Sequence, residues 1–196
     1  GASVSKAVKS LYEDYVEIIE MKDGTKFIIV SFLKAKGKPA HEIDLTNNHI
    51  KNWGKLIGKL HRLTKDYLPE NTVYKRREWY DEDFFKFDNE MTKRIDPRVV
   101  KKSEKIINMV KKLPADKASY GLIHTDAHTG NFFVDGEELT LFDFDDSAYK
   151  HFISDIAVAL FYYIEFSAKK EDRREITKKF LGTFLEGYYS EYNLDR

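Results

Sequence analysis

The chain begins with a pattern that is typical of β-strands. Residues 15–19 and 26–33 are two runs rich in β-branched and aromatic side chains, and Asp23 and Gly24 lie between them. An Asp-Gly pair between two such runs is a strong signal for a β-hairpin. Residues 34–39 contain a glycine and a proline, so we expect a linker there. The N-terminal part therefore predicts a small piece of antiparallel sheet.

From Thr46 onward the apolar residues recur every three or four positions, which is typical of an amphipathic helix. Thr46 is a suitable N-cap for this helix, which we expect to run to about residue 64. Gly54 and Gly58 lie one turn apart on it and predict close packing against a neighbouring element. The segment 70–97 is charged and aromatic, and we expect short helices and loops there.

Three further segments, 99–113, 153–166 and 172–189, are expected to be helices. The first should turn one apolar face inward and leave its lysines in solvent, and the last carries an apolar stripe at helical spacing. Such a stripe indicates a core more often than a ligand pocket. The inward residues are Ile106, Ile107, Val110 and Leu113 in the first helix and Ile176, Phe180, Phe184 and Tyr188 in the last.

A second hairpin signal lies between these helical segments. Residues 132–134 and 139–142 are apolar runs on either side of Asp135 and Gly136, and the apolar run 121–123 precedes them. We therefore expect a strand, a loop and a hairpin in this order.

Composition narrows the classes of function. The chain has 196 residues, and 33 basic residues balance 33 acidic ones to a formal net charge of zero. This balance points neither to nucleic acid nor to a membrane surface. A basic and aromatic surface in 70–97 could contact single-stranded nucleic acid, but the interleaved acids argue against it. These acids are Asp81, Glu82, Asp83 and Asp88.

The chain contains no cysteine, no signal-peptide pattern and no long apolar run. Disulfides and thiolate metal sites are thereby excluded within it. We expect a cytoplasmic protein.

The residues that could carry chemistry gather between His124 and Asp143. His124, Asp126 and Asn131 fit the pattern H-x-D-x-x-x-x-N, and Asp143 follows twelve residues after Asn131. A phosphoryl-transfer site needs this order of groups. Asp126 could accept the proton of a substrate hydroxyl or orient that hydroxyl for attack. The hairpin should return Asp143 to the side of Asn131, where both could hold Mg²⁺.

A rival interpretation uses His124, Asp126 and His128 as ligands of zinc or another transition metal, with hydrolase chemistry. The other histidines show no matching cluster, and this interpretation leaves the acids after the hairpin without a role. Among those acids, Asp145 and Asp146 could support the metal or face the substrate.

Residues 121–160 resemble the aminoglycoside phosphotransferase and choline kinase-like family of small-molecule kinases, whose fold is similar to that of protein kinases. The resemblance implies that Asp126 is the catalytic base or orienter and that His124 supports its loop. It also implies that Asn131 and Asp143 are the metal ligands.

The resemblance extends upstream of this run. Residues 30–33 and 36–39 look like the last strand of an N-lobe and the hinge of a kinase. The resemblance implies that backbone groups of Ser31, Phe32 and Leu33 meet the base of ATP or GTP.

Two more acids are candidates for the site. Asp155 matches an acid that anchors the backbone of the catalytic loop in such folds. Glu165, next to Tyr162, Tyr163 and Phe166, could bind a cationic substrate through charge and cation–π contacts. Core aromatics beside one exposed acid are the simpler account of that group.

We therefore expect an α+β protein kinase-like fold, with residues 1–36 as a partial N-lobe and 37–196 as a mainly helical catalytic C-lobe. The expected function is ATP-dependent, Mg²⁺-dependent phosphorylation of a small-molecule hydroxyl. The family usually carries a glycine-rich loop and a strand lysine that grip the phosphates, and no G-x-G-x-x-G occurs in the sequence. The alternative is a non-catalytic kinase-like binding protein or an inactive fragment. The sequence does not indicate an oligomeric state.

Overall fold

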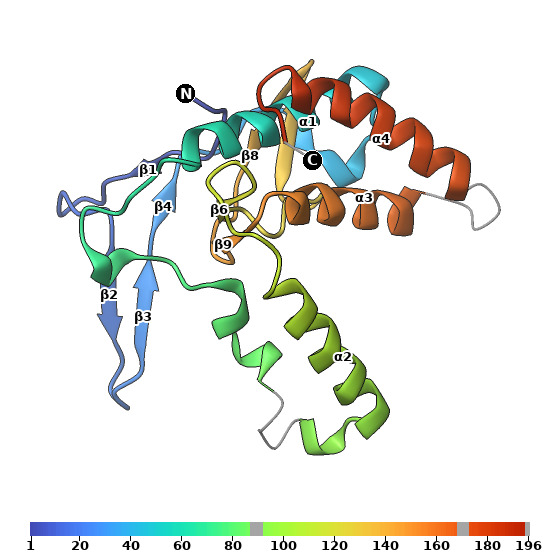
Figure 1. Ribbon diagram of the computed structural model, residues 1–196. Helices are drawn as coiled ribbons and strands as arrows, with labels where there is room; N and C mark the ends of the chain where they lie inside the picture. The colour runs from blue at the N-terminus through green and yellow to red at the C-terminus, as the bar shows by residue number, and fades with distance from the viewer. Residues whose placement is uncertain (87–91, 168–172, 195–196) are drawn as a thin grey trace.

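The computed structural model describes residues 1–86, 92–167 and 173–194, so Asp88 and the expected helix start at 172 lie outside the described residues. Three helices pack into a body, and one projects from it (Figure 1). The α-helices of the described chain are α1 (Asn47–Thr64), α2 (Pro97–Val110), α3 (Ile153–Ser167) and α4 (Arg173–Tyr189). The short 3-10 helices are η1 (Ala40–Glu42), η2 (Thr72–Tyr74), η3 (Trp79–Asp81), η4 (Asp83–Phe85) and η5 (Thr92–Arg94).

The strands form four small antiparallel sheets in the described chain. In the first two, β1 (Ala7–Val8) pairs with β4 (Ser31–Phe32), and β2 (Glu17–Glu20) pairs with β3 (Lys26–Ile29). In the third, β7 (Phe132–Asp135) lies between β5 (Lys38–Pro39) and β8 (Glu138–Leu141). In the fourth, β6 (Tyr120–Ile123) pairs with β9 (Ala148–His151).

The start of α1 holds the second hairpin in place. Thr46 caps the helix as predicted, because its side chain accepts from the His49 N–H while the His49 ring accepts from the Thr46 N–H. The other ring nitrogen of His49 lies 2.9 Å from the carbonyl oxygen of Gly136, and Asn52 Nδ2 donates to the carbonyl of Glu137 at 2.8 Å. The first turns of α1 therefore fix the turn between β7 and β8.

The helices α1 and α4 touch backbone to backbone. A Cβ built on Gly54 would lie 1.9 Å from the carbonyl oxygen of Phe184, and one built on Gly187 would lie 1.8 Å from that of Lys51. Gly58 meets the carbonyl oxygen of Tyr188 in the same way, at 2.6 Å. The close packing expected from the two α1 glycines is confirmed.

The centre of the core is Trp53 of α1, which is fully buried. Its ring centroid lies 4.9 Å from that of Phe132, 5.6 Å from that of Phe180 and 5.8 Å from that of Phe184. Together with Tyr188, which is also buried, the two α4 aromatics confirm that the predicted stripe of the last helix is core. The core thus joins α1 and α4 to the hairpin that follows the H-x-D motif.

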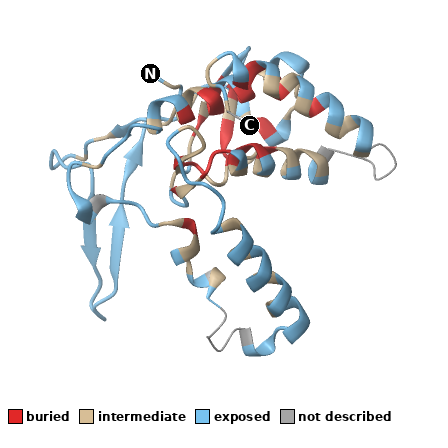
Figure 2. Cartoon of the chain, viewed as in Figure 1, coloured by how far each residue is buried: buried red, intermediate tan, exposed pale blue. Residues whose placement is uncertain are grey.

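Both predicted hairpins form, but the first one lies apart from the core. Gly24 takes the turn between β2 and β3 with φ +84°, and the run 26–33 divides into β3 and β4 at Val30. Every residue of β3 is exposed, and Ile28 keeps 73% of its surface. Figure 2 shows this hairpin in the colour of exposed residues, while the buried residues gather in the helical body.

The prediction that α2 turns an apolar face inward is wrong for the described structure. No residue of α2 is buried, and Ile106 and Met109 keep more than half of their surface. Ile107 and Val110 are only half-buried, and Leu113, beyond the helix end, is exposed. The periodicity did predict the helix, but α2 makes no extended contact with another element of the described chain. Within the described residues, no helix has the length and apolar character needed to cross a membrane.

Candidate active site

The loop that carries the H-x-D motif connects β6 to β7, and one buried carboxylate binds its backbone. Asp155, near the start of α3, is fully buried and accepts from the backbone N–H of His124 at 3.2 Å and from that of Thr125 at 2.7 Å. Thr125 has φ +70°, which is uncommon for a β-branched residue and needs such fixation. The carboxylate therefore sets the backbone path immediately before Asp126.

Asp155 is itself held by a histidine that the sequence did not single out. His61 of α1 is fully buried, and its Nε2 lies 3.0 Å from Asp155 Oδ2 while its Nδ1 lies 2.8 Å from the Tyr188 hydroxyl. The ring also stacks on Phe152 at 4.5 Å between centroids. The available signal was weak, since a histidine on the apolar face of a helix is usually a satisfied core residue.

Burial and hydrogen bonding act in opposite directions on Asp155. Burial alone would raise the pKa of its carboxyl, but the hydrogen bond and charge of His61, the charge of His124 and the Thr125 N–H lower it more. The pKa of Asp155 thus lies below its ordinary value. The anchor of the loop is an ionised carboxylate near neutral pH.

Asp126 and Asn131 lie side by side at the two ends of the loop. The buried Asn131 donates from Nδ2 to the carbonyl of Asp126 at 2.9 Å and to Asp126 Oδ2 at 3.0 Å. Because the amide nitrogen is used in this way, the side-chain oxygen of Asn131 is the atom available to a ligand. Among the described residues, Asp126 Oδ1 has no hydrogen-bond partner. The arrangement presents two oxygens of different charge from one loop.

The two histidines of the loop are bonded to backbone groups. His124 Nε2 lies 2.9 Å from the carbonyl oxygen of Phe142, and its Nδ1 accepts from the Asp126 N–H at 3.3 Å. His128 Nδ1 accepts from the Gly130 N–H at 2.9 Å, and its Nε2 lies 3.3 Å from Asp126 Oδ2. In the described part of the chain, no group of three or more acids and histidines is arranged to hold a metal. The geometry therefore gives no support to the zinc hydrolase interpretation.

The second hairpin returns the chain to the loop as expected. The Phe142 N–H donates to the carbonyl of Asn131 at 2.9 Å, so the next residue, Asp143, follows directly from this contact. Asp143 is exposed and has φ +65°, a left-handed conformation that turns the chain sharply. Asp145 and Asp146 are exposed in the same turn. Carboxylate and amide oxygens are the ligands that Mg²⁺ prefers, so this donor set fits that ion.

Ser31, Phe32 and Leu33, which are expected to meet the nucleotide base, are partly bonded to the first strand. Leu33 donates its N–H to the carbonyl of Lys6 at 2.9 Å, while Ser31 and Phe32 lie opposite β1. Backbone bonding in an antiparallel pair alternates from residue to residue. The N–H and C=O of Phe32 therefore point away from β1, so among these three residues Phe32 is the one with neither backbone group bonded to that strand in the described chain.

Gly37, in the predicted hinge 36–39, attaches this segment to the β7–β8 hairpin. It has φ +83°, and a Cβ built on it would lie 1.9 Å from the carbonyl oxygen of Val134. Lys38 and Pro39 then pair with β7. The hinge and the loop of Asp126 are thus attached to the same three-stranded sheet.

A cleft of about 800 Å³ opens beside the loop that carries the H-x-D motif. Tyr162 of α3 stacks on His128 at 4.4 Å between ring centroids. Glu165 is exposed, forms an ion pair with Arg173 at 3.0 Å and does not line this cleft. The residues that line the cleft with side chains of functional interest are His41, Asp44, His128, Thr129, Tyr163 and Phe166.

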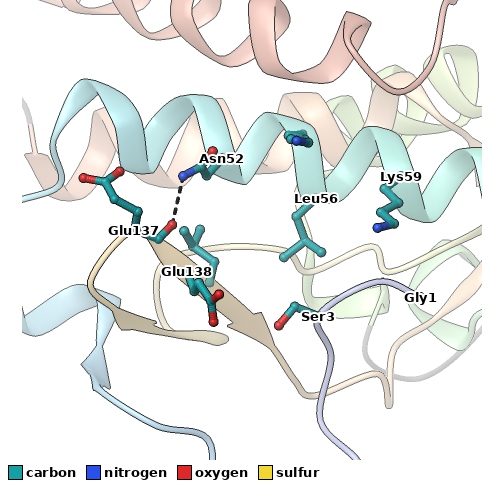
Figure 3. Close-up of a pocket in the computed structure, with 9 residues that line it drawn as sticks. Gly1, Ser3, Asn52, Leu56, Lys59, Glu137 and Glu138 are labelled. Atoms are coloured by element: carbon teal, nitrogen blue, oxygen red, sulfur yellow. Dashed lines mark hydrogen bonds between the residues drawn. The ribbon is translucent and has the colours of Figure 1, made fainter.

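A second cavity, of about 450 Å³, lies between α1 and β8 (Figure 3). Figure 3 shows Asn52 bonded to Glu137 at one end and Lys59 at the other, with Leu56 between them. None of the residues that line it belongs to the loop 124–131 or to the turn 143–146. We therefore do not assign this cavity to the candidate active site.

Comparisons with known proteins identify the family to which the chain is similar. A model of the family described as "Phosphotransferase enzyme family" matches residues 13–193. An amicoumacin kinase of Bacillus subtilis (strain 168) is 32% identical over 196 residues, which are all of this chain and 58% of that protein. The chain thus spans less than two thirds of the length of this curated relative.

Solved structures are similar over the same extent. A structure described as amicoumacin kinase in complex with AMP-PNP, Ca²⁺ and Ami has a TM-score of 0.90 and 34% identity, and the match covers 100% of this chain and 58% of that one. A microcompartment-associated aminopropanol kinase has a TM-score of 0.72 and 18% identity, with 99% and 61% covered, which shows a shared fold only. The predicted α+β protein kinase-like fold is confirmed.

Proposed function

Because this chain belongs to the phosphotransferase enzyme family, we propose that it transfers the terminal phosphoryl group of ATP or GTP to a hydroxyl of a small molecule. The observation that supports this most is the pairing of Asp126 with Asn131 beside the turn of Asp143. This pairing leaves one carboxylate oxygen and one amide oxygen available to ligands.

Asp126 is the residue to which we assign the acceptor hydroxyl. Its Oδ2 is held by Asn131, which leaves Oδ1 to receive a hydrogen bond from the hydroxyl. As the oxygen attacks phosphorus, its proton passes to Oδ1 or is oriented by it. His124 supports this arrangement, because it bonds both to the Asp126 N–H and to the carbonyl of Phe142.

We assign Asn131 and Asp143 as the ligands of a Mg²⁺ ion. When bound, such an ion neutralises charge on the phosphates of the nucleotide. The hairpin β7–β8 sets the spacing between the two ligands, and Asp145 and Asp146 add negative charge at the same turn. We assign the free backbone groups of Phe32 to the nucleotide base, with Ser31 and Leu33 flanking it.

The cleft beside His128 is our candidate for the acceptor site. Its walls include aromatic rings, and Asp44 supplies a carboxylate, so it suits an alcohol that also carries a cationic amine. The solved relative is described as a complex with Ami, and amicoumacin is therefore the first compound to test on this chain. Glu165 remains a secondary candidate for cation binding, because Arg173 already neutralises it in this structure.

We also propose that the protein works in the cytoplasm. It contains no cysteine, which suits a reducing compartment, and its proposed co-substrate is a nucleotide.

The test is turnover with ATP or GTP, Mg²⁺ and a panel of amicoumacin, aminoglycosides and choline. Asp126→Asn preserves the shape of the side chain but not its basicity, and we expect kcat to fall by about 10²- to 10⁴-fold. The matched control is Asp135→Asn, because Asp135 is an exposed acid on the β7–β8 hairpin. This variant should retain full activity. Turnover that survives in Asp126→Asn would contradict the assignment. Nucleotide binding without turnover of any acceptor would favour the non-catalytic alternative.

A further inference from the structure

The turn that carries Asp143 needs support from outside itself. Asp143 has a left-handed φ of +65°, and Asp143, Asp145 and Asp146 are all exposed acids within four residues. Like charges this close repel each other, and a left-handed non-glycine residue adds strain. Inside the turn, Ser147 donates its N–H to the carbonyl of Phe144 at 3.1 Å. The bonds to the carbonyls of Asp145 and Asp146 come from residues outside the turn.

One arginine supplies most of this support. Arg76 Nη1 donates to the carbonyl of Asp145 at 2.9 Å, and Nη2 reaches that of Phe144 at 3.4 Å. The next carbonyl, of Asp146, accepts from Thr125 Oγ1 at 2.8 Å. A planar guanidinium with two parallel N–H groups matches two consecutive carbonyls better than an ammonium does. The turn is thus held from outside by Arg76 and by the catalytic loop.

The neighbours of Arg76 fix its position. Arg77 accepts from the Tyr149 N–H at 2.9 Å through its carbonyl, and Glu78 accepts from the Tyr120 hydroxyl at 2.6 Å. Lys75 Nζ lies 4.9 Å from the centroid of the Tyr149 ring. The segment 75–78 is therefore attached to β6 and β9, the strands that lead to and from the site. The backbone of Arg76 is thus held in place, and its side chain extends to the turn of Asp143.

We propose that Arg76 is a positioning residue that holds the Asp143 turn in the conformation required for metal binding. It acts through the carbonyls of Phe144 and Asp145, and it does not itself touch the metal or the substrate. The inference rests on the proposed function, because it concerns the ligand Asp143. Arg77 carries the same charge next to the same acids, with its guanidinium 3.9 Å from Asp146 Oδ1, but donates to none of these carbonyls.

The experiment compares Arg76→Ala, Arg76→Lys and the matched control Arg77→Ala. The first readout is amide hydrogen exchange of Ser147 in the free chain, because among the described residues its N–H is the amide of this turn that has a backbone partner. The second is the affinity for Mn²⁺, measured by electron paramagnetic resonance with a non-hydrolysable ATP analogue. Thermal unfolding checks that each variant is folded.

We expect Arg76→Ala to raise exchange in the turn and to weaken Mn²⁺ binding by about tenfold, while the unfolding midpoint changes little. Arg76→Lys keeps the charge but loses the two parallel N–H groups of the guanidinium, so it should resemble Arg76→Ala. Arg77→Ala should stay close to the wild-type chain in both readouts.

Two outcomes would overturn the proposal, and a third would separate its failure from that of the proposed function. Equal effects of Arg76→Ala and Arg77→Ala would mean that net charge, rather than the carbonyl bonds, is responsible. Unchanged exchange in Arg76→Ala would mean that the turn holds itself. If the wild-type chain binds no Mn²⁺ with the analogue, the metal site of the proposed function fails first, and the exchange data then show separately whether Arg76 orders the turn.

Discussion

At the scale of the residue, a single buried carboxylate organises the loop that carries the H-x-D motif. Asp155 receives two backbone N–H groups and the ring of His61, and His61 in turn meets the hydroxyl of Tyr188. Side chains from α1, α3 and α4 thereby form one hydrogen-bonded chain that ends at two backbone amides of the loop. A buried charge is tolerated here because several donors surround it, and it would be costly if any of them were lost.

The loss of folding stability at acid pH should depend on Asp155. Because its pKa is lowered in the folded chain, it binds its proton more readily when unfolded. Its contribution is therefore complete above the unfolded pKa of about 4 and is lost as the pH falls through the folded value. We expect Asp155→Asn to cost about 2–4 kcal/mol near neutrality and to flatten the loss of stability below about pH 4.

Urea unfolding of the wild-type chain and of Asp155→Asn from neutral to acid pH measures this effect. Asp135→Asn, in an exposed carboxylate, is the control and should follow the wild-type profile. Parallel profiles for the wild-type chain and Asp155→Asn would show that the acid dependence arises elsewhere.

The contact between α1 and α4 dominates at the scale of the element. Glycines on both helices allow backbone atoms to meet, so Trp53 can reach the aromatic rings of α4 and of β7. The same helix caps the turn of the catalytic hairpin at its start and supplies His61 near its end. The position of α1 against α4 therefore affects both the turn of the second hairpin and the His61 that holds Asp155.

Two glycine-to-alanine substitutions should act in opposite directions. Gly54→Ala would place a methyl group in the carbonyl of Phe184, and we expect a loss of about 2–4 kcal/mol despite the better helix propensity. Gly182→Ala, on the exposed side of α4 with no atom within 4 Å, should gain about 0.5–1 kcal/mol. Chemical denaturation of both variants measures this, and a neutral Gly54→Ala would contradict the described helix contact.

Local signals in the sequence predicted most of the elements, and contacts between distant residues account for what was missed. The Asp-Gly pairs predicted both hairpins, Thr46 predicted the start of α1, and the hairpin after Asn131 predicted the return of the chain to the loop of Asp126. The partnership of His61 with Asp155 could not be predicted, because it joins positions 94 residues apart. Periodicity likewise predicted α2 as a helix, but could not show whether a partner covers its apolar face.

Two parts of the chain stand apart from the core at the scale of the whole molecule. The β2–β3 hairpin exposes Ile18, Phe27 and Ile28, and α2 exposes its apolar side (Figure 2). The boundary between a partial N-lobe at 1–36 and a C-lobe at 37–196 remains our proposal. Residues 3–5 belong to the proposed N-lobe but contact the proposed C-lobe, because Ser3 and Ser5 bond to the backbone of Leu141 in β8.

The hairpin should open independently of the core in this chain. A two-stranded hairpin is marginally stable by itself in water, and β2 and β3 bond only to each other among the described strands. We expect the amides of 17–29 to exchange with solvent far faster than those of α1 and α4. Native-state hydrogen exchange measures this, and protection of the hairpin equal to that of α1 would show that it belongs to the same cooperative unit.

The left-handed backbone at Asp143 has a consequence for evolution. Glycine relieves such a conformation, so Asp143→Gly would remove a proposed metal ligand and at the same time gain about 1 kcal/mol of folding stability. Aspartate and glycine codons differ by a single base. A lineage released from selection for the proposed metal binding would therefore gain folding stability by a single base change, so the proposed ligand persists here only while selection maintains it against the preference of the fold.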